Sequence, residues 1–213
     1  MVRTKAVRAL FCVAVCLFSS ALASAQKGAG KPRIAVFGFL NLTGNDVFDI
    51  PAETAGNNLA FALKTLGLYE VSEPETIARN FSDSTLLKWC AKNSVDTVMY
   101  GVIQQAADGG SNYQLSVFDA AKKTTTVRKK AAGQSVLDVF QVSDELSAAV
   151  LGAVTGRRIS FGSISFTNTG SAGDYSVSVD GVIVEGSPGV VDQVVSGKHR
   201  VLVLSGASKT EVL

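Results

Sequence analysis

The spacing of apolar and polar positions changes twice along the chain, and these changes divide it into three parts. An apolar run of residues 9–23 lies close to the N-terminus. Strand-like runs then alternate with helical patterns as far as residue 156, and from residue 159 onward only short alternating runs remain. The pattern predicts an N-terminal leader, a segment that mixes helices and strands, and a small all-β module.

The mixed segment opens with a strand, because Arg33 to Leu40 is rich in β-branched and aromatic residues. Apolar residues at helical spacing predict a helix over Asp49–Gly67, with Gly67 at the position after the last turn. The later elements that the pattern predicts are a strand at 68–71, a short helix starting at the capping box Ser72-Glu73-Pro74-Glu75, a helix at 84–93 capped by Ser84, a strand at 96–103, a hairpin of 113–117 with 124–129, and a helix at 135–154.

The C-terminal part alternates valines and other apolar residues with polar ones, without any helical pattern. Asp180-Gly181 between valines is a strong signal for a two-residue hairpin turn. The predicted fold class is therefore α+β: a three-layer-like α/β N-terminal domain with a mixed sheet, plus a small all-β, sandwich-like C-terminal module. The predicted parts are a signal peptide at 1–25, a linker at 26–32, an α/β domain at 33–156 and a β domain at 159–213.

Residues 1–25 have the composition of a secretory signal peptide. Basic residues precede the apolar run, and Ala23-Ser24-Ala25 supplies the small residues that a signal peptidase reads. We expect cleavage after Ala25, export to the periplasm or cell surface, and no transmembrane segment in the mature chain. An uncleaved anchor is the alternative, although the run is short for a spanning helix. Lipidation of Cys12 or Cys16 is disfavoured because bulky residues precede both.

The chain of 213 residues carries a net charge of +2, but Arg3, Lys5 and Arg8 belong to the leader. Seventeen basic and 18 acidic residues then remain, a net charge of −1. A nearly neutral protein has no long-range field that would attract nucleic acid, so no nucleic-acid partner is predicted. The basic run Arg128-Lys129-Lys130, at the exit of a predicted strand, is interpreted as a guard against edge pairing.

No catalytic, cofactor-binding or metal-binding residues are predicted. His199 is the single histidine, which excludes multi-histidine metal sites, and a structural role is expected for it. Cys90, the one cysteine of the mature chain, lies in a helical pattern and is expected to be a small buried residue. The acidic pairs have local explanations, and the glycines form neither a P-loop nor a dinucleotide-binding fingerprint. The protein is therefore predicted not to be an enzyme.

The best candidate site is the polar loop that follows the opening strand. Open α/β sheets place ligands at the carboxyl ends of their strands, and a polar, glycine-containing loop there can also dock a protein. The candidate partner-binding residues are Asn41, Thr43, Asn45, Asp46 and Asp49. The plain alternative is a connecting loop without a ligand.

Two family resemblances follow from these motifs. The segment 33–156, with IAVFGFLNLTGND, NNLAFALKTLGLYEV and CAKNSVDTVMYGVI, resembles the TolB N-terminal-like and CsgG/LpoB-like α/β domains of bacterial envelope proteins. The segment 162–205, with Val179-Asp180-Gly181, Gly186-Ser187-Pro188 and Ser196-Gly197-Lys198-His199, resembles the PEGA domain. After the position of Leu204, members of that family continue through a Gly-aromatic turn into another strand. This chain has SGASKTEVL at that place, without the Gly-aromatic pair, so a last strand is expected to be missing.

The resemblances imply an exported, non-enzymatic cell-envelope protein. Its α/β domain would dock an envelope protein, and its β module would bind or space it at a cell-wall or surface component. The alternatives are an activator of a peptidoglycan-synthesising enzyme, as LpoB-like domains are, an envelope hydrolase, or a structural subunit of a larger envelope assembly.

Overall fold

The computed structural model describes residues 30–74, 81–167, 175–184, 186, 189–205 and 208–212. The predicted signal peptide, its cleavage point and most of the linker lie outside the described residues, and so does most of the short helix predicted after Ser72. The chain divides into two compact units, Met1–Lys31 and Pro32–Leu213. All of the elements below belong to the second unit.

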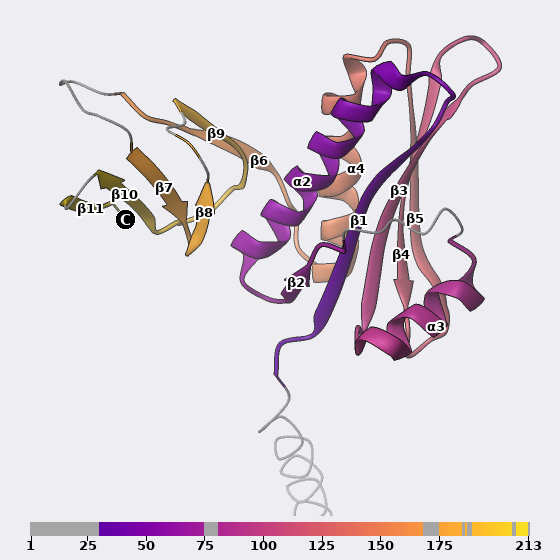
Figure 1. Cartoon of the computed structure of the whole chain (residues 1–213), viewed down its shortest axis with the longest axis horizontal. Helices are drawn as coiled ribbons and strands as arrows, with labels where there is room; N and C mark the ends of the chain where they lie inside the picture. The colour runs from indigo at the N-terminus through magenta and orange to yellow at the C-terminus, as the bar shows by residue number, and fades with distance from the viewer. Residues whose placement is uncertain are drawn as a thin grey trace, which may run out of the picture. The chain divides into compact units, whose positions relative to one another are not determined.

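A five-stranded mixed sheet in the order β2-β1-β3-β4-β5 forms the centre of the α/β region. β1 is parallel to both of its neighbours, and β4 is antiparallel to β3 and β5. Helices α2 and α4 cover one face and the shorter α3 the other (Figure 1). The element bounds are β1 Arg33–Leu42, α2 Asp49–Leu66, β2 Glu70–Ser72, α3 Asp83–Asn93, β3 Thr97–Gln105, β4 Ser111–Asp119, β5 Thr124–Gly133 and α4 Asp138–Thr155. The mixed sheet confirms the predicted α+β class.

β1 is apolar on both faces because helices cover both. Ile34 and Val36 pack into the cluster under α2 and α4, while Ala35 and Phe37 pack under α3. Phe37 also meets Trp89 of α3 edge to face, at a ring-centroid distance of 4.9 Å. A strand buried on both faces has a continuous apolar run rather than alternation, which is why the sequence identifies it clearly.

A β-bulge interrupts β1 where α2 approaches it most closely. The register with β3 shifts between Val36 and Phe39, and Gly38 has a φ of +68°, which glycine adopts without strain. A Cβ on Gly56 of α2 would lie 2.7 Å from the Cα of Gly38. On β3, the ring of Phe39 occupies the place of a side chain at Gly101. The glycine at each of these positions leaves room for its neighbour.

Several predicted boundaries differ from those of the structure. β1 runs to Leu42, so Asn41 lies within the strand instead of in the loop. Ser82, and not Ser84, caps α3, because its side chain accepts a hydrogen bond from the Thr85 backbone. Ser72 lies in β2, and the body of the helix predicted after it lies outside the described residues. The helix ends are predicted well, since Gly67 and Gly156 adopt the left-handed conformation that terminates α2 and α4.

The C-terminal region consists of two small antiparallel sheets. β6 (Phe161–Ser165) pairs with β9 (Val190–Val195), and a second sheet has the order β11-β10-β7-β8, with β7 Tyr175–Val179, β8 Val182–Val184, β10 Val201–Ser205 and β11 Ser208–Val212. The hairpin at Asp180-Gly181 is confirmed, with both residues at positive φ. A strand does follow β10, so the expectation of a missing last strand is wrong. The division into domains at 156–159 stays a prediction.

Asp144 of α4 contacts β9 through a hydrogen bond that it accepts from Gln193, 2.5 Å away. Burial, opposed by this hydrogen bond and reinforced by Asp192 and Glu145, raises the pKa of Asp144 above its ordinary value. A carboxyl whose pKa is higher in the folded than in the unfolded state destabilises the fold when it is ionised. This penalty is absent below the unfolded pKa, grows as the pH rises from the unfolded to the folded pKa, and is complete above the folded pKa.

Replacing Asp144 by asparagine should therefore stabilise the protein at pH 7, since an amide oxygen can still accept the hydrogen bond from Gln193. The gain in the urea midpoint over the wild type should shrink towards zero as the pH falls to about 4, the ordinary carboxyl pKa. Glu53→Gln, at an exposed carboxylate of α2, is the control for loss of charge. A gain for Asp144→Asn that does not change with pH would contradict this account.

Gly56→Ala should destabilise the protein even though alanine favours helices. The overpacking against Gly38 costs about 1–3 kcal/mol, and the gain in helix propensity is at most ~1 kcal/mol. Urea denaturation measures the difference. Gly162→Ala, where no atom lies within 4 Å of the added Cβ, is the control and should change stability little. Equal effects of the two substitutions would show that the close approach does not matter.

Candidate functional site

The loop after β1 is held in shape by the side chain of Asn41. Its amide nitrogen donates to Asp49 Oδ1 at 2.7 Å and to the Asn45 carbonyl at 2.9 Å. Its carbonyl oxygen accepts hydrogen bonds from the backbone and the hydroxyl of Thr43, at 3.0 and 2.7 Å. One strand residue thus joins both ends of the loop, and four of the five predicted site residues form one network.

The loop then enters a 3₁₀ turn, η1 (Asp46–Phe48), that leads directly into α2. Asn45 caps this turn by accepting a hydrogen bond from the Val47 backbone at 3.1 Å. Phe48 is buried in the core, and the side chain of Asp46, the fifth predicted site residue, is exposed. The loop is therefore anchored, and it presents its carboxylates outward.

A cavity of about 610 Å³ lies beside this loop, between β1, α2 and the residues that follow β2. We refer to it as the β1–α2 groove. Gly38, Phe39 and Asn41 line it from β1, and Asp49, Glu53 and Asn57 line it from α2. The volume lies within the range of ligand-binding clefts.

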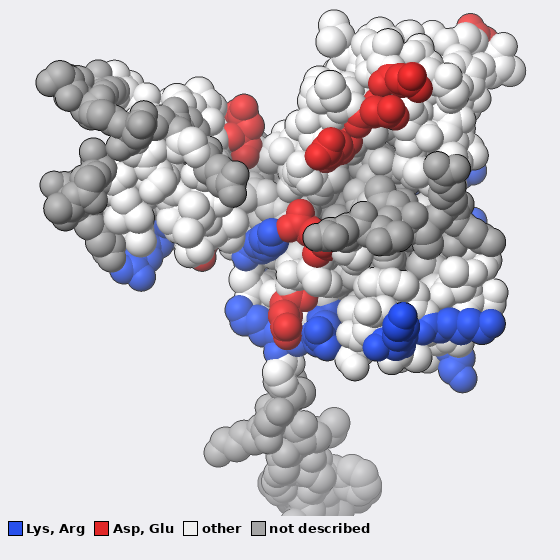
Figure 2. All heavy atoms as spheres, in the orientation of Figure 1, with Lys and Arg blue, Asp and Glu red and all other residues white. Residues whose placement is uncertain are grey.

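Acidic side chains border the groove along α2. Figure 2 shows a row of acidic side chains over the first turns of this helix, where Asp46, Asp49 and Glu53 follow one another. Within the described part of the chain, none of these three forms an ion pair with a basic residue, whereas Glu73, farther along the groove, pairs with Lys64. Among the described residues, the α2 side of the groove therefore carries negative charge that no basic side chain pairs with.

Exposed apolar side chains gather at the same end of the α/β region. β5 runs in the same direction as β1, so α2 and α4, which follow these strands, begin at the same end of the sheet (Figure 1). Ile50 is 77% exposed and Leu137 is 74% exposed. We call this set the apical surface; its members are Val47, Ile50, Leu137 and Phe140. Exposed apolar groups concentrated at one place are typical of an interaction site.

Sequence reasoning found the loop but missed the groove and the apical surface. Phe140 belongs to the apolar pattern of the helix predicted at 135–154, yet it is 41% exposed near the start of α4. Gly38 is a bulge glycine in contact with α2 instead of a turn glycine. The one available signal was the pair Val47 and Ile50, two bulky apolar residues inside a polar loop and first turn.

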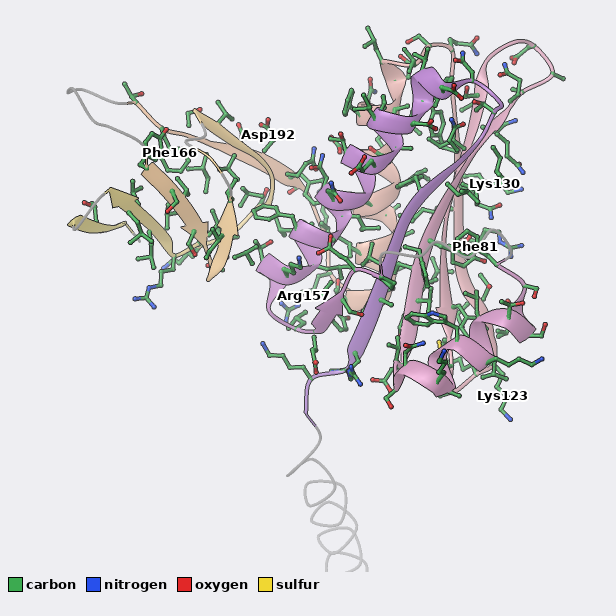
Figure 3. All side chains as sticks on the ribbon, in the orientation of Figure 1. Phe81, Lys123, Lys130, Arg157, Phe166 and Asp192 are labelled. Atoms are coloured by element: carbon green, nitrogen blue, oxygen red, sulfur yellow. The ribbon has the colours of Figure 1, made fainter. Side chains whose placement is uncertain are left out.

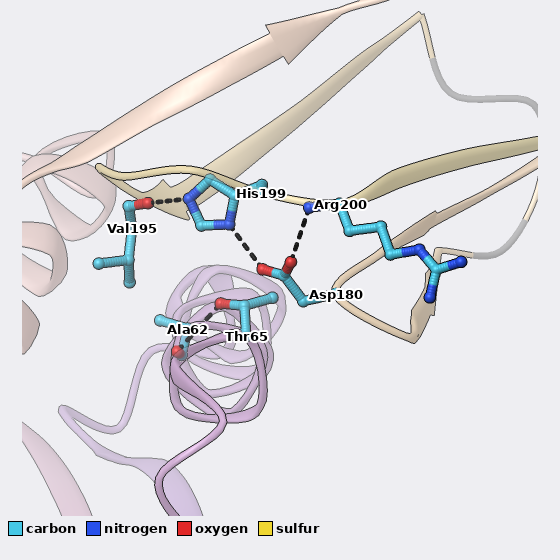
Figure 4. Close-up of polar contacts among 6 residues, drawn as sticks. All are labelled: Ala62, Thr65, Asp180, Val195, His199 and Arg200. Carbon is cyan, nitrogen blue, oxygen red and sulfur yellow. Dashed lines mark hydrogen bonds and ion pairs between the residues drawn. The ribbon is translucent and has the colours of Figure 1, made fainter. Parts of the chain in front are cut away.

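The other candidate residues have structural roles. Both ring nitrogens of His199 are hydrogen-bonded, one to Asp180 in the β7–β8 turn and the other to the Val195 carbonyl (Figure 4), which agrees with the structural role expected of it. Cys90 is buried under α3, and burial raises the pKa of its thiol, which keeps it protonated. The basic run Arg128-Lys129-Lys130 lies inside β5, an edge strand, and not at its exit.

Within the described residues, no group of three or more metal-ligating side chains comes together. No helix in the same part of the chain has the length and apolar character needed to cross a membrane.

No family model matches this chain, and no curated protein matches it. Similar solved structures include TolB from Acinetobacter baumannii, at 19% identity and a TM-score of 0.46, covering 87% of this chain and 39% of that one. A PelC dodecamer from Paraburkholderia phytofirmans matches at 18% identity and a TM-score of 0.37, covering 57% of this chain and 85% of that one. The LpoB C-terminal domain from Salmonella enterica matches at 11% identity and a TM-score of 0.36, covering 54% and 92%.

TolB and LpoB are two of the families that the sequence motifs resemble. The chain spans about two fifths of the length of the TolB structure. At these identities and TM-scores the likenesses carry no argument about a ligand or partner, so the function has to be argued from the residues of this chain.

Asn41→Asp should disrupt the loop more than Asn41→Ala. The alanine variant loses the hydrogen bonds of the side chain, at about 1–2 kcal/mol in total. The aspartate variant also loses the donor to Asp49 and places a second carboxylate beside it. Urea denaturation should show that the wild type is the most stable, the alanine variant less stable and the aspartate variant the least stable. Added salt should reduce the difference in stability between the alanine and aspartate variants, because it screens the repulsion between the two carboxylates. Asn112→Asp, at an exposed strand position, is the control. An equal loss of stability in that variant would show that Asn41 has no special role in holding the loop.

Proposed function

We propose that this protein is an exported, non-enzymatic component of the cell envelope, and that it docks a protein partner through the apical surface. The observation that carries the proposal is the exposure of the four apolar side chains at one end of the sheet. The N-terminal signal-peptide pattern supports the export. The resemblance of 33–156 to the TolB-like and CsgG/LpoB-like domains supports the envelope.

The composition of the apical surface favours a protein over a small molecule. Ile50 and Leu137 are aliphatic and largely exposed, and carboxylates from Asp46 and Asp49 lie next to them. Apolar anchors with a polar rim are the usual anatomy of a protein–protein interface. The Asn41 network holds the loop in one conformation, so less conformational entropy is lost when a partner binds.

The β module gives the proposal its second part. On the PEGA resemblance of 162–205, this region would bind or space the protein at a cell-wall or surface component. An activator of a peptidoglycan-synthesising enzyme is the second candidate function, supported by the resemblance to LpoB-like domains. It differs from plain docking because the partner's rate would rise on binding.

Ile50→Asp combined with Leu137→Asp should weaken partner binding at least tenfold while leaving stability almost unchanged, because both side chains are exposed in the free protein. The partner is first identified by photo-crosslinking from position 50 in intact envelopes, and binding is then measured with both purified proteins. Ile183→Asp is the matched control, an aliphatic residue of β8 that is 68% exposed.

Equal weakening by the control, or full binding by the double variant, would overturn docking through the apical surface. Assays of the purified partner with and without this protein separate the two candidate functions. A partner whose rate rises on binding is being activated, and one whose rate is unchanged is only docked.

A further inference from the structure

Among the described residues, β1 has a strand partner on its outer edge only along its first half. β2 pairs only with Arg33–Ala35, and its register ends at Ser72. From Val36 to Leu42, β1 has β3 on one side and no strand among the described residues on the other. The backbone groups along such an edge can pair with another extended chain.

The open edge lies in the β1–α2 groove. Val36 to Asn41 line the cavity from the strand, and α2 stands beside them at the distance fixed by the Gly38–Gly56 contact. An extended segment placed in the groove would therefore have backbone partners on β1 and side-chain partners on α2. An edge strand next to a helix, with a groove between them, suits strand addition.

The acidic side chains on the α2 side of the groove favour a ligand that carries positive charge. Asp49 and Glu53 line it, Asp46 continues the row, and the described residues give none of the three a basic partner. Side chains of an extended peptide alternate between two faces, so every second residue would face these carboxylates. Lysine or arginine at those positions would neutralise them.

We propose that the β1–α2 groove binds an extended, lysine- or arginine-containing segment of a partner protein, which adds to β1 at Phe39–Leu42, where the described residues supply no outer strand. The inference deepens the proposed function, because the groove shares Asp49 with the loop next to the apical surface. It names the element that the partner contributes, a basic strand, whereas the apical surface supplies apolar anchoring.

The probe is a fluorescein-labelled synthetic peptide of eight residues in which lysine and valine alternate, titrated into the mature protein. A second peptide has glutamate in place of lysine, and a third carries N-methyl groups on alternate backbone amides. Binding of the first alone, read by fluorescence anisotropy, is expected, because the second repels the carboxylates and the third cannot pair with β1. Binding of all three alike would overturn strand addition.

Glu53→Lys should weaken binding of the lysine peptide about tenfold, because it places a like charge in the groove. Glu145→Lys, at an exposed position of α4, makes the same charge change outside the groove and should leave the affinity unchanged. Asn57→Trp fills the groove without altering charge and should also weaken binding. Amide hydrogen exchange in Phe39–Leu42 should slow when the peptide binds; exchange unaltered at saturation would overturn the assignment to β1.

The same measurements separate this inference from the proposed function. Ile50→Asp with Leu137→Asp should leave peptide binding intact, because neither residue lines the groove. If a partner crosslinks at position 50 but no peptide binds, the inference about the groove is overturned, while docking through the apical surface remains supported. Self-association that depends on Lys129 would also overturn the proposal of a partner protein. The occupant of the groove would then be the basic edge strand β5 of a second copy of this chain. Lys130 of this strand is labelled in Figure 3.

Discussion

Helix α2 can lie against β1 only because glycine stands on both sides of their closest approach. A Cβ on Gly56 would be 2.7 Å from Gly38, nearer than real Cβ contacts allow. The bulge at Gly38 and the short helix–strand distance therefore depend on each other. This contact sets how closely α2 lies against β1, and so the separation of the two walls of the groove.

The apical surface and the β1–α2 groove offer a partner two different kinds of contact. The apical surface presents apolar side chains that cost free energy while they face water. Among the described residues, the groove presents a strand edge without an outer strand partner and α2 carboxylates that form no ion pair. A partner that covers the first and adds a basic strand to the second would satisfy both. The Asn41 network, which joins the end of β1 to the start of α2, holds the two surfaces in a fixed relation.

How far the sequence predicts the site depends on whether a residue acts through local or long-range contacts. The sequence predicts Asn45 as a loop residue because turns have a local chemistry, and it caps the turn as such residues do. The polar pattern predicts Asn41 in the loop, although its backbone belongs to β1, because the pairing that extends the strand comes from β3. Gly56 gave no signal, since an isolated glycine inside a helical pattern does not show what it touches.

The sequence by itself determined the order and type of most elements, the buried character of β1 and the left-handed ends of α2 and α4. These features follow from apolar periodicity and from the freedom of glycine, both of which are local. Only the tertiary structure decided that β2 is too short to cover β1, that the starts of α2 and α4 share one end of the sheet, and that Phe140 is exposed. Each of these depends on which segments distant in the chain meet, and a pattern read along one chain does not contain that information.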